Sequence, residues 1–169
     1  MGEKVRNWLV VCVQSNREKK TYERLTALGF EAFLPLQEEM HRWSDRNKKV
    51  QRVVIPMVVF ARLASTEYIQ ALRLPSVNRF MVLRGESTPA LIPDSQMERF
   101  RFMLDYSEQA VEMCSEHLQP GEQVKVIKGP LTGLTGELMT VDGKSKVAVR
   151  INMLGAALVE VAVGFVERL

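Results

Sequence analysis

The chain has 169 residues, of which 46% are hydrophobic and 25% are charged, and its formal net charge at pH 7 is +3. This is the composition of a soluble globular protein with one medium domain or two small ones. The apolar runs WLVVCV (8–13) and VVIPMVVFA (53–61) are too short for a signal-peptide core or a membrane span, so we expect a cytoplasmic protein without membrane contact.

The first part of the chain reads as a strand followed by a helix. NWLVVCV (7–13) is apolar and β-branched, which predicts a buried strand. Asn16 is expected to cap a helix that runs from about Arg17 to Leu28 and ends at Gly29.

This helix pattern has two distinct sides. Helical spacing should point Tyr22, Leu25 and Leu28 toward the core. A basic stripe recurs on another side and consists of Arg17, Lys20 and Arg24.

The following residues predict further strands. EAFLPLQEEM should form a strand that turns at Pro35, and RVVIPMVVFARL (52–63) an apolar strand. The polar, basic segment 41–52 between them is expected to be a loop at a hairpin tip. A short helix is expected over 66–73, and a strand over 76–84.

Another helix should begin near Asp94, because Met97, Phe100 and Leu104 then form an apolar face. The order of these elements predicts a small α+β sandwich over residues 5–106.

The last third of the chain predicts a separate small domain. Residues 107–118 carry three glutamates and no base, which predicts an acidic linker. Beyond it, strand patterns alternate with turn signals such as Asp142-Gly143, and five short strands should close into a barrel that leaves no exposed edges. The tail ALVEVAVGFVE alternates with period two and favours a strand, although INMLGAALVEVAV also fits helical spacing.

The segment KVIKGPLTGLTGEL (125–138) interleaves chain-breaking and apolar residues. A flexible linker or a helix would not show this pattern, whereas a corner between the first two strands of a small barrel would. A hairpin that serves stability alone fits equally well. The corner would be formed by Gly129, Pro130, Gly133 and Gly136.

Residues that commonly carry chemistry are few and dispersed. Cys12 and Cys114 lie far apart and fit buried thiols in a reducing compartment, and His41 and His117 have no Cys or Asp at ligand spacing. The sequence shows no glycine-rich phosphate loop, nucleophile motif or carboxylate pair with an evident role. We therefore expect no metal, no cofactor and no enzymatic activity.

Two parts of the chain resemble a known family. QVKVIKGPLTGLTGEL resembles the KOW motif, in which basic and apolar residues alternate before G-P-x-x-G-x-x-G. The stretches NWLVVCVQSNREKKTYERLTALGFEAFLP, WSDRNKKVQRVVIPMVVFARL and SVNRFMVLRGESTPALIPDSQMERF resemble, in this order, the N-terminal domain of NusG proteins. The length and the tail GKSKVAVRINMLGAALVEVAVGFVERL are similar to those of UpxY-type antiterminators of capsular polysaccharide operons, with RfaH as a more distant functional analogue.

The resemblance implies an NGN-type α/β sandwich (1–106), a linker (107–118) and a five-stranded SH3-like KOW β-barrel (119–169). It implies an operon-specific, non-enzymatic antitermination and processivity factor for polysaccharide biosynthesis genes. Such a factor binds elongating RNA polymerase at the clamp helices of the largest subunit, bridges the cleft toward the gate loop, and suppresses pausing and termination. The implied contact residues are Trp8, Cys12, Ile55, Pro56, Met57, Val58, Phe60, Phe80 and Met97.

The sequence departs from this family in two places. NusG proteins usually carry an F-P-G-Y-type stretch, and the matching residues here are Ile55-Pro56-Met57-Val58, so two aromatic anchors are lost. The threonine-rich gate-loop motif of RfaH is not visible in 66–73, which puts the bridge to the gate loop in doubt.

Two basic regions are candidates for contact with the non-template DNA strand or the nascent leader RNA. In the family the stripe-bearing helix lies near the non-template strand, but the stripe also fits a solvated helix face. Segment 41–52 combines five bases and one acid with a tryptophan that can stack on bases or tuck against its own sheet. The candidate residues are Arg17, Lys20 and Arg24 in the stripe, and Arg42, Trp43, Arg46, Lys48 and Lys49 in the segment.

Other interpretations stay open. The chain fits an RNA- or ribosome-binding protein that uses its KOW barrel, although 119–169 holds six Lys and Arg against five Asp and Glu, which argues against a dominant RNA surface. The barrel fits better as a docking site for a ribosomal protein or a termination factor. It could also cover the polymerase-binding patch until recruitment.

Overall fold

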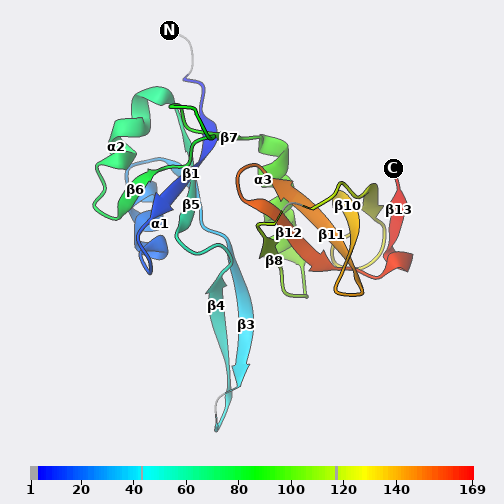
Figure 1. Cartoon of the computed structure of the whole chain (residues 1–169). Coiled ribbons are helices and arrows are strands. Elements are labelled where there is room, and N and C mark those ends of the chain that lie inside the picture. The colour runs from blue at the N-terminus through cyan, green and yellow to red at the C-terminus, as the bar shows by residue number, and fades with distance from the viewer. Residues whose placement is uncertain (1–3, 43, 117) are drawn as a thin grey trace. The chain divides into compact units, whose positions relative to one another are not determined.

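The computed structural model describes residues 4–42, 44–116 and 118–169 (Figure 1). The chain forms two compact units, each built from two separate stretches of sequence. The first comprises Met1–Pro35 with Ile55–Asp94, and the second comprises Leu36–Val54 with Ser95–Leu169. A few helices and several antiparallel sheets make up the described residues, in agreement with the predicted mixture of α and β structure.

An antiparallel sheet lies at the centre of the first unit (Figure 1). Its strand order is β2-β5-β1-β6, and β7 also pairs with β1. Consecutive residues of β1 from Trp8 to Val11 are buried, so both faces of this strand are shielded from solvent, as the sequence predicted for 7–13. The strands are β1 (Asn7–Val13), β2 (Glu31–Phe33), β5 (Val58–Leu63), β6 (Val77–Phe80) and β7 (Leu91–Ile92).

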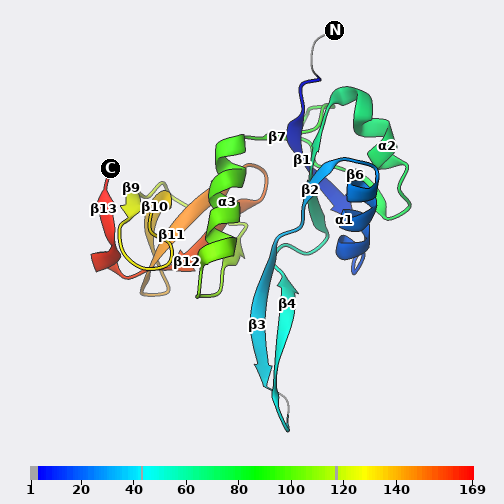
Figure 2. The ribbon, with the colours of Figure 1, turned by 180° about the vertical axis from the view of Figure 1, so that it is seen from behind.

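Helix α1 (Glu18–Ala27) packs against β2 and β5 (Figure 2). It ends before Gly29, whose φ of 88° confirms the predicted glycine stop. The predicted cap is wrong, because Asn16 has φ 63° in the turn before the helix and no side chain caps the helix. The predicted apolar face is wrong at Leu28, which is 44% exposed, because the helix turns Thr21 inward along with Leu25.

The rest of the first unit follows the predicted order. A 3₁₀ turn, η1 (Ser65–Glu67), leads into helix α2 (Tyr68–Leu72), which packs against β6 and confirms the short helix expected over 66–73. β6 occupies only part of the strand predicted over 76–84.

A two-stranded ribbon, β3 (Leu36–Arg42) and β4 (Asn47–Val53), replaces the loop expected over 41–52 (Figure 1). The prediction was wrong because polar residues suffice for a ribbon whose backbone groups pair with each other, as they do from Leu36↔Val53 to Arg42↔Asn47. The single strand expected over 52–63 is also wrong. β4 ends at Val53 and β5 begins at Val58, with a turn between them.

A six-stranded antiparallel sheet forms much of the second unit, in the order β13-β9-β10-β11-β12-β8. Five of its strands lie within 119–169, a range that the structure describes throughout, which matches the predicted number there. Helix α3 (Asp94–Tyr106) buries Met97, Phe100 and Leu104, as its sequence pattern predicted. The strands are β8 (Glu112–Cys114), β9 (Glu122–Val126), β10 (Thr135–Val141), β11 (Lys144–Ile151), β12 (Gly155–Glu160) and β13 (Val166–Arg168).

Two expectations for this unit need correction. The segment expected as a linker, 107–118, contains β8, which pairs with β12 from Ala156↔Cys114 to Leu158↔Glu112. The tail does not continue as one strand, because β12 ends at Glu160 and a 3₁₀ turn, η2 (Val163–Phe165), precedes β13. The helical alternative for INMLGAALVEVAV is wrong for this structure, where these residues belong to strands and turns.

The glycine-rich corner lies between β9 and β10, as predicted. Gly129 and Gly133 have φ of 86° and 101°, in the left-handed region. At Gly136 a glycine is required for lack of space, because an added Cβ would lie 2.6 Å from the carbonyl oxygen of Ala148 on the neighbouring strand. Asp142 and Gly143, with φ of 52° and 76°, form the predicted tight turn between β10 and β11.

Candidate functional site

A basic hollow of about 210 Å³ lies beside α1 in the first unit. Helical spacing brings the three predicted stripe cations to its wall, and the turn before β6 supplies the opposite side. The described residues that line it carry three positive charges and no negative charge. They are Gln14, Arg17, Lys20, Arg24, Pro75 and Ser76.

Buried hydrogen bonds hold α1 against this turn. The hydroxyls of Thr21 and Ser76 are 2.7 Å apart and share a hydrogen bond, and both residues are buried. The N–H of Gln14 donates to the carbonyl of Ser76 at 2.9 Å. Sequence reasoning missed Gln14, Pro75 and Ser76, because the two sides of the hollow are more than fifty residues apart and no local pattern links them.

The β3–β4 ribbon presents the second set of predicted cations, Arg42, Arg46, Lys48 and Lys49, which we call the basic ribbon; all four are exposed. The strand register places Lys49 opposite Met40 and Lys48 opposite position 41. Since neighbouring residues of a strand point to opposite faces, Lys48 and Lys49 lie on different faces of the ribbon. Trp43, predicted to stack on bases, lies outside the described residues, as does His117.

The base of the ribbon is anchored by one glutamine. The Gln37 side-chain carbonyl accepts the N–H of Val111 at 2.8 Å, and its amide donates to the carbonyl of Gln109 at 2.8 Å. Arg52 donates to the carbonyl of Val111 at 2.7 Å and to Gln37 at 3.1 Å. The ribbon is therefore fixed at its base to the segment 109–111.

The residues predicted to contact RNA polymerase are mostly buried. Trp8, Ile55, Val58, Phe60 and Phe80 belong to the core of the first unit, and Cys12 is half-buried. Burial raises the pKa of the Cys12 thiol, and the positive charge of Arg79 opposes this shift. Met97 lies on α3 in the second unit and is buried as well. Of the nine predicted residues, Pro56 and Met57 are the exposed ones.

The turn that carries Met57 has an unusual backbone. Met57 has φ 64°, and its side chain is 46% exposed. In the F-P-G-Y pattern from which this stretch departs, the matching position is glycine, for which positive φ carries no steric penalty. The replacement of that glycine by methionine could have indicated an unusual backbone at this turn. The sequence analysis considered only the two lost aromatic residues.

A carboxylate anchors the N-terminal edge of the first unit. Arg6 donates to both oxygens of Glu67, at 2.9 and 3.1 Å, and the N–H of Ala64 donates to Glu67 at 2.9 Å. The hydrogen bond from Arg6 is the main reason that the pKa of Glu67 lies below its ordinary value. This arrangement is structural, since it fixes η1 to the start of β1.

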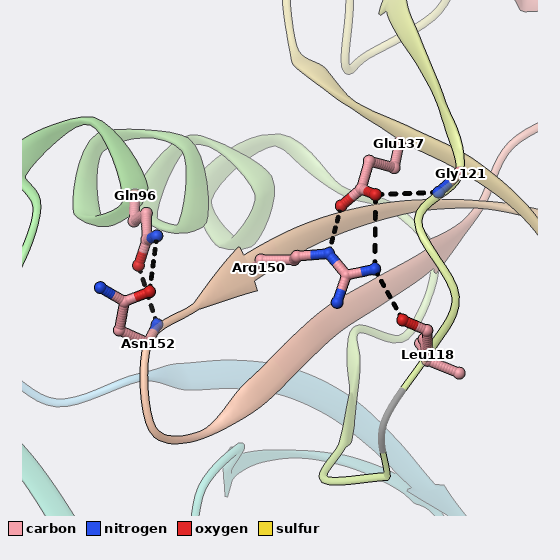
Figure 3. Close-up of polar contacts among 6 residues, drawn as sticks. All are labelled: Gln96, Leu118, Gly121, Glu137, Arg150 and Asn152. Atoms are coloured by element: carbon pink, nitrogen blue, oxygen red, sulfur yellow. Dashed lines mark hydrogen bonds and ion pairs between the residues drawn. The ribbon is translucent and has the colours of Figure 1, made fainter. Parts of the chain in front are cut away.

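A polar network crosses the second unit (Figure 3). The buried Glu137 accepts from Arg150 at 2.5 Å and from the N–H of Gly121 at 2.9 Å, and Arg150 also donates to the carbonyl of Leu118 at 2.9 Å. These bonds fix residues 118–121 to β10 and β11. The side-chain amide of Gln96, on α3, donates to the side-chain oxygen of Asn152, and the backbone N–H of Asn152 donates to the side-chain oxygen of Gln96.

The second unit also has a hollow of about 310 Å³ at the glycine-rich corner. Apolar residues of the corner and the tail line much of it, and Phe165 is 41% exposed there. The corner residue Pro130 and the neighbouring Leu131, Val161 and Ala162 contribute to its wall. The exposed Pro130, Ala162 and Phe165 on this wall fit a protein surface better than a phosphate backbone.

No group of three or more His, Cys, Asp or Glu in the described parts of the chain is arranged to hold a metal ion. None of the helices in the described ranges is long and apolar enough to cross a membrane.

Comparison with known proteins identifies the family. The family model for "Transcription termination factor nusG" matches residues 6–101, more than half of the chain. The chain is 28% identical over 165 residues to the transcription termination/antitermination protein NusG of Bacillus subtilis, covering 89% of this chain and 90% of that protein. It is 26% identical over 186 residues to NusG of Staphylococcus carnosus, covering 100% of both.

A solved structure shares the fold. The structure described as "Domain interaction in Thermotoga maritima NusG" aligns with a TM-score of 0.55 at 21% identity, over 97% of both chains. The family match, which covers β1 to most of α3, shows that the chain belongs to the NusG family of transcription termination and antitermination factors.

Proposed function

We propose that this protein is an operon-specific antitermination and processivity factor that binds elongating RNA polymerase and suppresses pausing and termination. The target genes would be those of polysaccharide biosynthesis, as the resemblance to UpxY-type antiterminators implies. Membership of the NusG family supports the general role. The observation that carries the specific role is that the first unit presents both a basic hollow and an exposed apolar turn.

The basic hollow fits a nucleic-acid backbone. Three cations converge on a concave surface, and Lys and Arg that contact phosphates make binding depend on salt. The ligand would be the non-template DNA strand or the nascent leader RNA. The basic ribbon, which belongs to the second unit, would make a contact of its own with nucleic acid and contribute to recognition of the recruitment sequence.

The apolar turn at Pro56 and Met57 fits a protein partner, for which we propose the clamp helices of the largest polymerase subunit. Buried members of the predicted contact set that belong to this sheet, such as Phe60, would support β5, the strand that follows this turn. In the second unit, the apolar hollow beside Phe165 would dock a ribosomal protein or a termination factor. The assignment of polymerase binding to residues 1–106 and of docking to a KOW barrel at 119–169 belongs to the same proposal.

The test uses the full chain, because the two units interleave in sequence. Binding to core RNA polymerase is measured, and then read-through of a terminator in transcription of templates with and without the leader of the operon. We expect binding on its own and leader-dependent read-through. Absence of polymerase binding by a folded chain that still binds RNA would replace this proposal with an RNA- or ribosome-binding function.

A further inference from the structure

The short strand β8 lies in a segment that the sequence predicts as a free linker. It pairs with β12 over three residues and is the last strand in the order of the six-stranded sheet. A strand of three residues at the end of a sheet gains little stability from its own ladder. The contacts that flank β8 must therefore supply much of what holds it.

The base of the β3–β4 ribbon supplies the contacts before β8. Val111, which directly precedes β8, is buried. Its N–H donates to the side-chain oxygen of Gln37 at 2.8 Å, and its carbonyl accepts from Arg52 at 2.7 Å. Gln37 and Arg52 lie opposite each other in the ribbon, so one cross-strand pair satisfies both backbone groups of Val111. We call Gln37, Arg52 and Val111 the latch.

The sheet of the second unit holds β8 on its other side. Cys114 packs against a buried cluster that includes Ala148, Ala156 and Leu158. Gly155 permits this close approach, because an added Cβ would lie 2.0 Å from the carbonyl oxygen of Cys114. The contact of β8 with β12 can therefore be broken from this side without any change in the ribbon.

Arg52 connects the latch to the basic ribbon. Because alternate residues of a strand share a face, Lys48, Val50 and Arg52 of β4 lie on one face of the ribbon. Lys48 and Arg52 are about 13 Å apart along the strand, and the Arg52 side chain is 29% exposed. A strand of nucleic acid bound at Lys48 along this face therefore reaches Arg52.

A phosphate group competes with the latch for the Arg52 guanidinium. In the structure this group forms an ion pair with Glu39 and donates to the carbonyl of Val111. A phosphate oxygen is a stronger acceptor than a neutral carbonyl, and a guanidinium binds phosphate through two parallel hydrogen bonds. Once phosphate holds Arg52, the buried carbonyl of Val111 loses its donor, which is costly unless the segment moves into solvent.

We propose that the latch is a switch through which nucleic acid on the basic ribbon releases β8 from β12. With the latch closed, residues 109–114 are fixed between the ribbon and β12. With the latch open, residues 107–116 become a flexible tether that spans up to about 35 Å. The coupling is reciprocal, so a change that opens the latch raises affinity for nucleic acid. The inference rests on the proposed function, because it takes the basic ribbon as a nucleic-acid contact.

The first test is hydrogen exchange in the full chain. The substitutions Arg17→Ala, Lys20→Ala and Arg24→Ala remove the cations of the basic hollow, so that a single-stranded DNA oligonucleotide of about 12 nucleotides reports binding to the ribbon. At low salt the oligonucleotide should speed exchange of the amides of 111–114 by about threefold or more, and leave β10 unchanged. Unchanged or slower exchange at 111–114 with the oligonucleotide bound would overturn the inference.

A disulfide can hold β8 in place. Ala156 lies directly opposite Cys114 on neighbouring strands, at a spacing that a disulfide can bridge. In the same background, the oxidised Ala156→Cys chain should bind the oligonucleotide about threefold more weakly than the same chain after reduction. Equal affinity of the two forms would show that β8 does not move on binding, and the inference would be wrong.

Two substitutions should open the latch from opposite sides. Gln37→Ala removes the acceptor of the Val111 N–H, and Gly155→Ala forces Cys114 away from β12; each should bind the oligonucleotide about threefold more tightly. Gly133→Ala is the control for Gly155→Ala, because Gly133 has a similar φ (101° against 95°) but an added Cβ would meet no atom within 4 Å. Its affinity should not rise. Unchanged affinity in either folded latch variant would contradict the coupling.

The outcomes separate this inference from the proposed function. If the oligonucleotide does not bind the unsubstituted chain, the nucleic-acid contact of the proposed function fails, and the switch fails with it. If the oligonucleotide binds the unsubstituted chain but not the triple variant, the ribbon makes no contact and the switch alone fails. If it binds both and exchange at 111–114 does not rise, the proposed function stands and the switch is wrong.

Discussion

The basic hollow beside α1 and the basic ribbon of β3 and β4 contain similar numbers of cations, but they present them in different ways. In the hollow, one helix and one turn bring three cations to a common concave wall. In the ribbon, the alternation of strand residues places Lys48 and Lys49 on opposite faces. A dense run of basic residues in sequence is therefore a poorer indicator of a convergent phosphate site than three cations at helical spacing.

Removing the cations of the basic hollow should have the largest effect on oligonucleotide affinity, and it should distinguish the hollow from the ribbon. The triple substitution Arg17→Ala, Lys20→Ala and Arg24→Ala should weaken binding to a single-stranded oligonucleotide by roughly tenfold to a hundredfold. If each cation contacts one phosphate, the negative slope of log affinity against log salt should become shallower by about 2. Fluorescence anisotropy across a salt series measures both.

The matched variant is Arg46→Ala, Lys48→Ala and Lys49→Ala, which removes the same charge from the ribbon. It should weaken oligonucleotide binding less, reduce leader dependence of read-through and leave polymerase binding intact. A larger loss from the ribbon variant would reverse the comparison, and loss of polymerase binding would contradict the assignment of the ribbon to nucleic acid.

Removing the side chain that anchors the ribbon should have the next largest effect, and this effect should be on stability. Gln37→Ala removes the acceptor of the Val111 N–H and of Arg52, which should reduce the free energy of unfolding by about 1–3 kcal/mol. Urea unfolding measures this change, with Gln51→Ala on the exposed part of the same ribbon as control. No change from Gln37→Ala would mean that the ribbon is held in another way.

The next prediction concerns the buried hydrogen bond behind the wall of the basic hollow. Thr21→Val leaves the buried Ser76 hydroxyl without its partner, so the free energy of unfolding should fall by about 1 kcal/mol and oligonucleotide affinity should fall slightly. Thr26→Val is the control on the same helix, since its hydroxyl bonds the carbonyl of Tyr22 and is exposed. Equal effects of the two variants would deny the Thr21–Ser76 pair a special role.

The smallest effect should come from pH and should concern the first unit. The pKa of Glu67 lies below its ordinary value of 4.5 in the folded state, so the unfolded state binds its proton first as pH falls. The stabilisation is complete above 4.5 and is lost progressively as pH falls toward the lowered pKa. Thermal unfolding between pH 6 and pH 3 should show a shallower acid decline for Glu67→Gln, and identical slopes would mean that the ion pair adds no stability.

Local patterns predicted several elements correctly. The buried strand at 7–13, the short helix after η1 and the apolar face of α3 follow from hydrophobic spacing within a few residues. The turn at Asp142-Gly143 follows from backbone chemistry alone. These features depend on neighbours in sequence, so a single chain carries enough information to place them.

The wrong predictions have different causes. β8 was expected as linker because its strand character depends on β12. The ribbon was expected as loop because neither of its strands has an apolar side to indicate pairing. The Asn16 cap failed because the turn before α1 takes a left-handed backbone at that residue instead.

By itself, the sequence determined the helical spacing of Arg17, Lys20 and Arg24, the glycine-rich corner, and the resemblance to NusG proteins that the family match confirms. Only the tertiary structure decided that these cations line a hollow with Gln14 and Ser76, and that Met57 stands exposed and strained in front of Glu18. The physical reason is that spacing along a helix is local, whereas a concave wall or a backbone held in a strained conformation requires hydrogen bonds between segments distant in sequence.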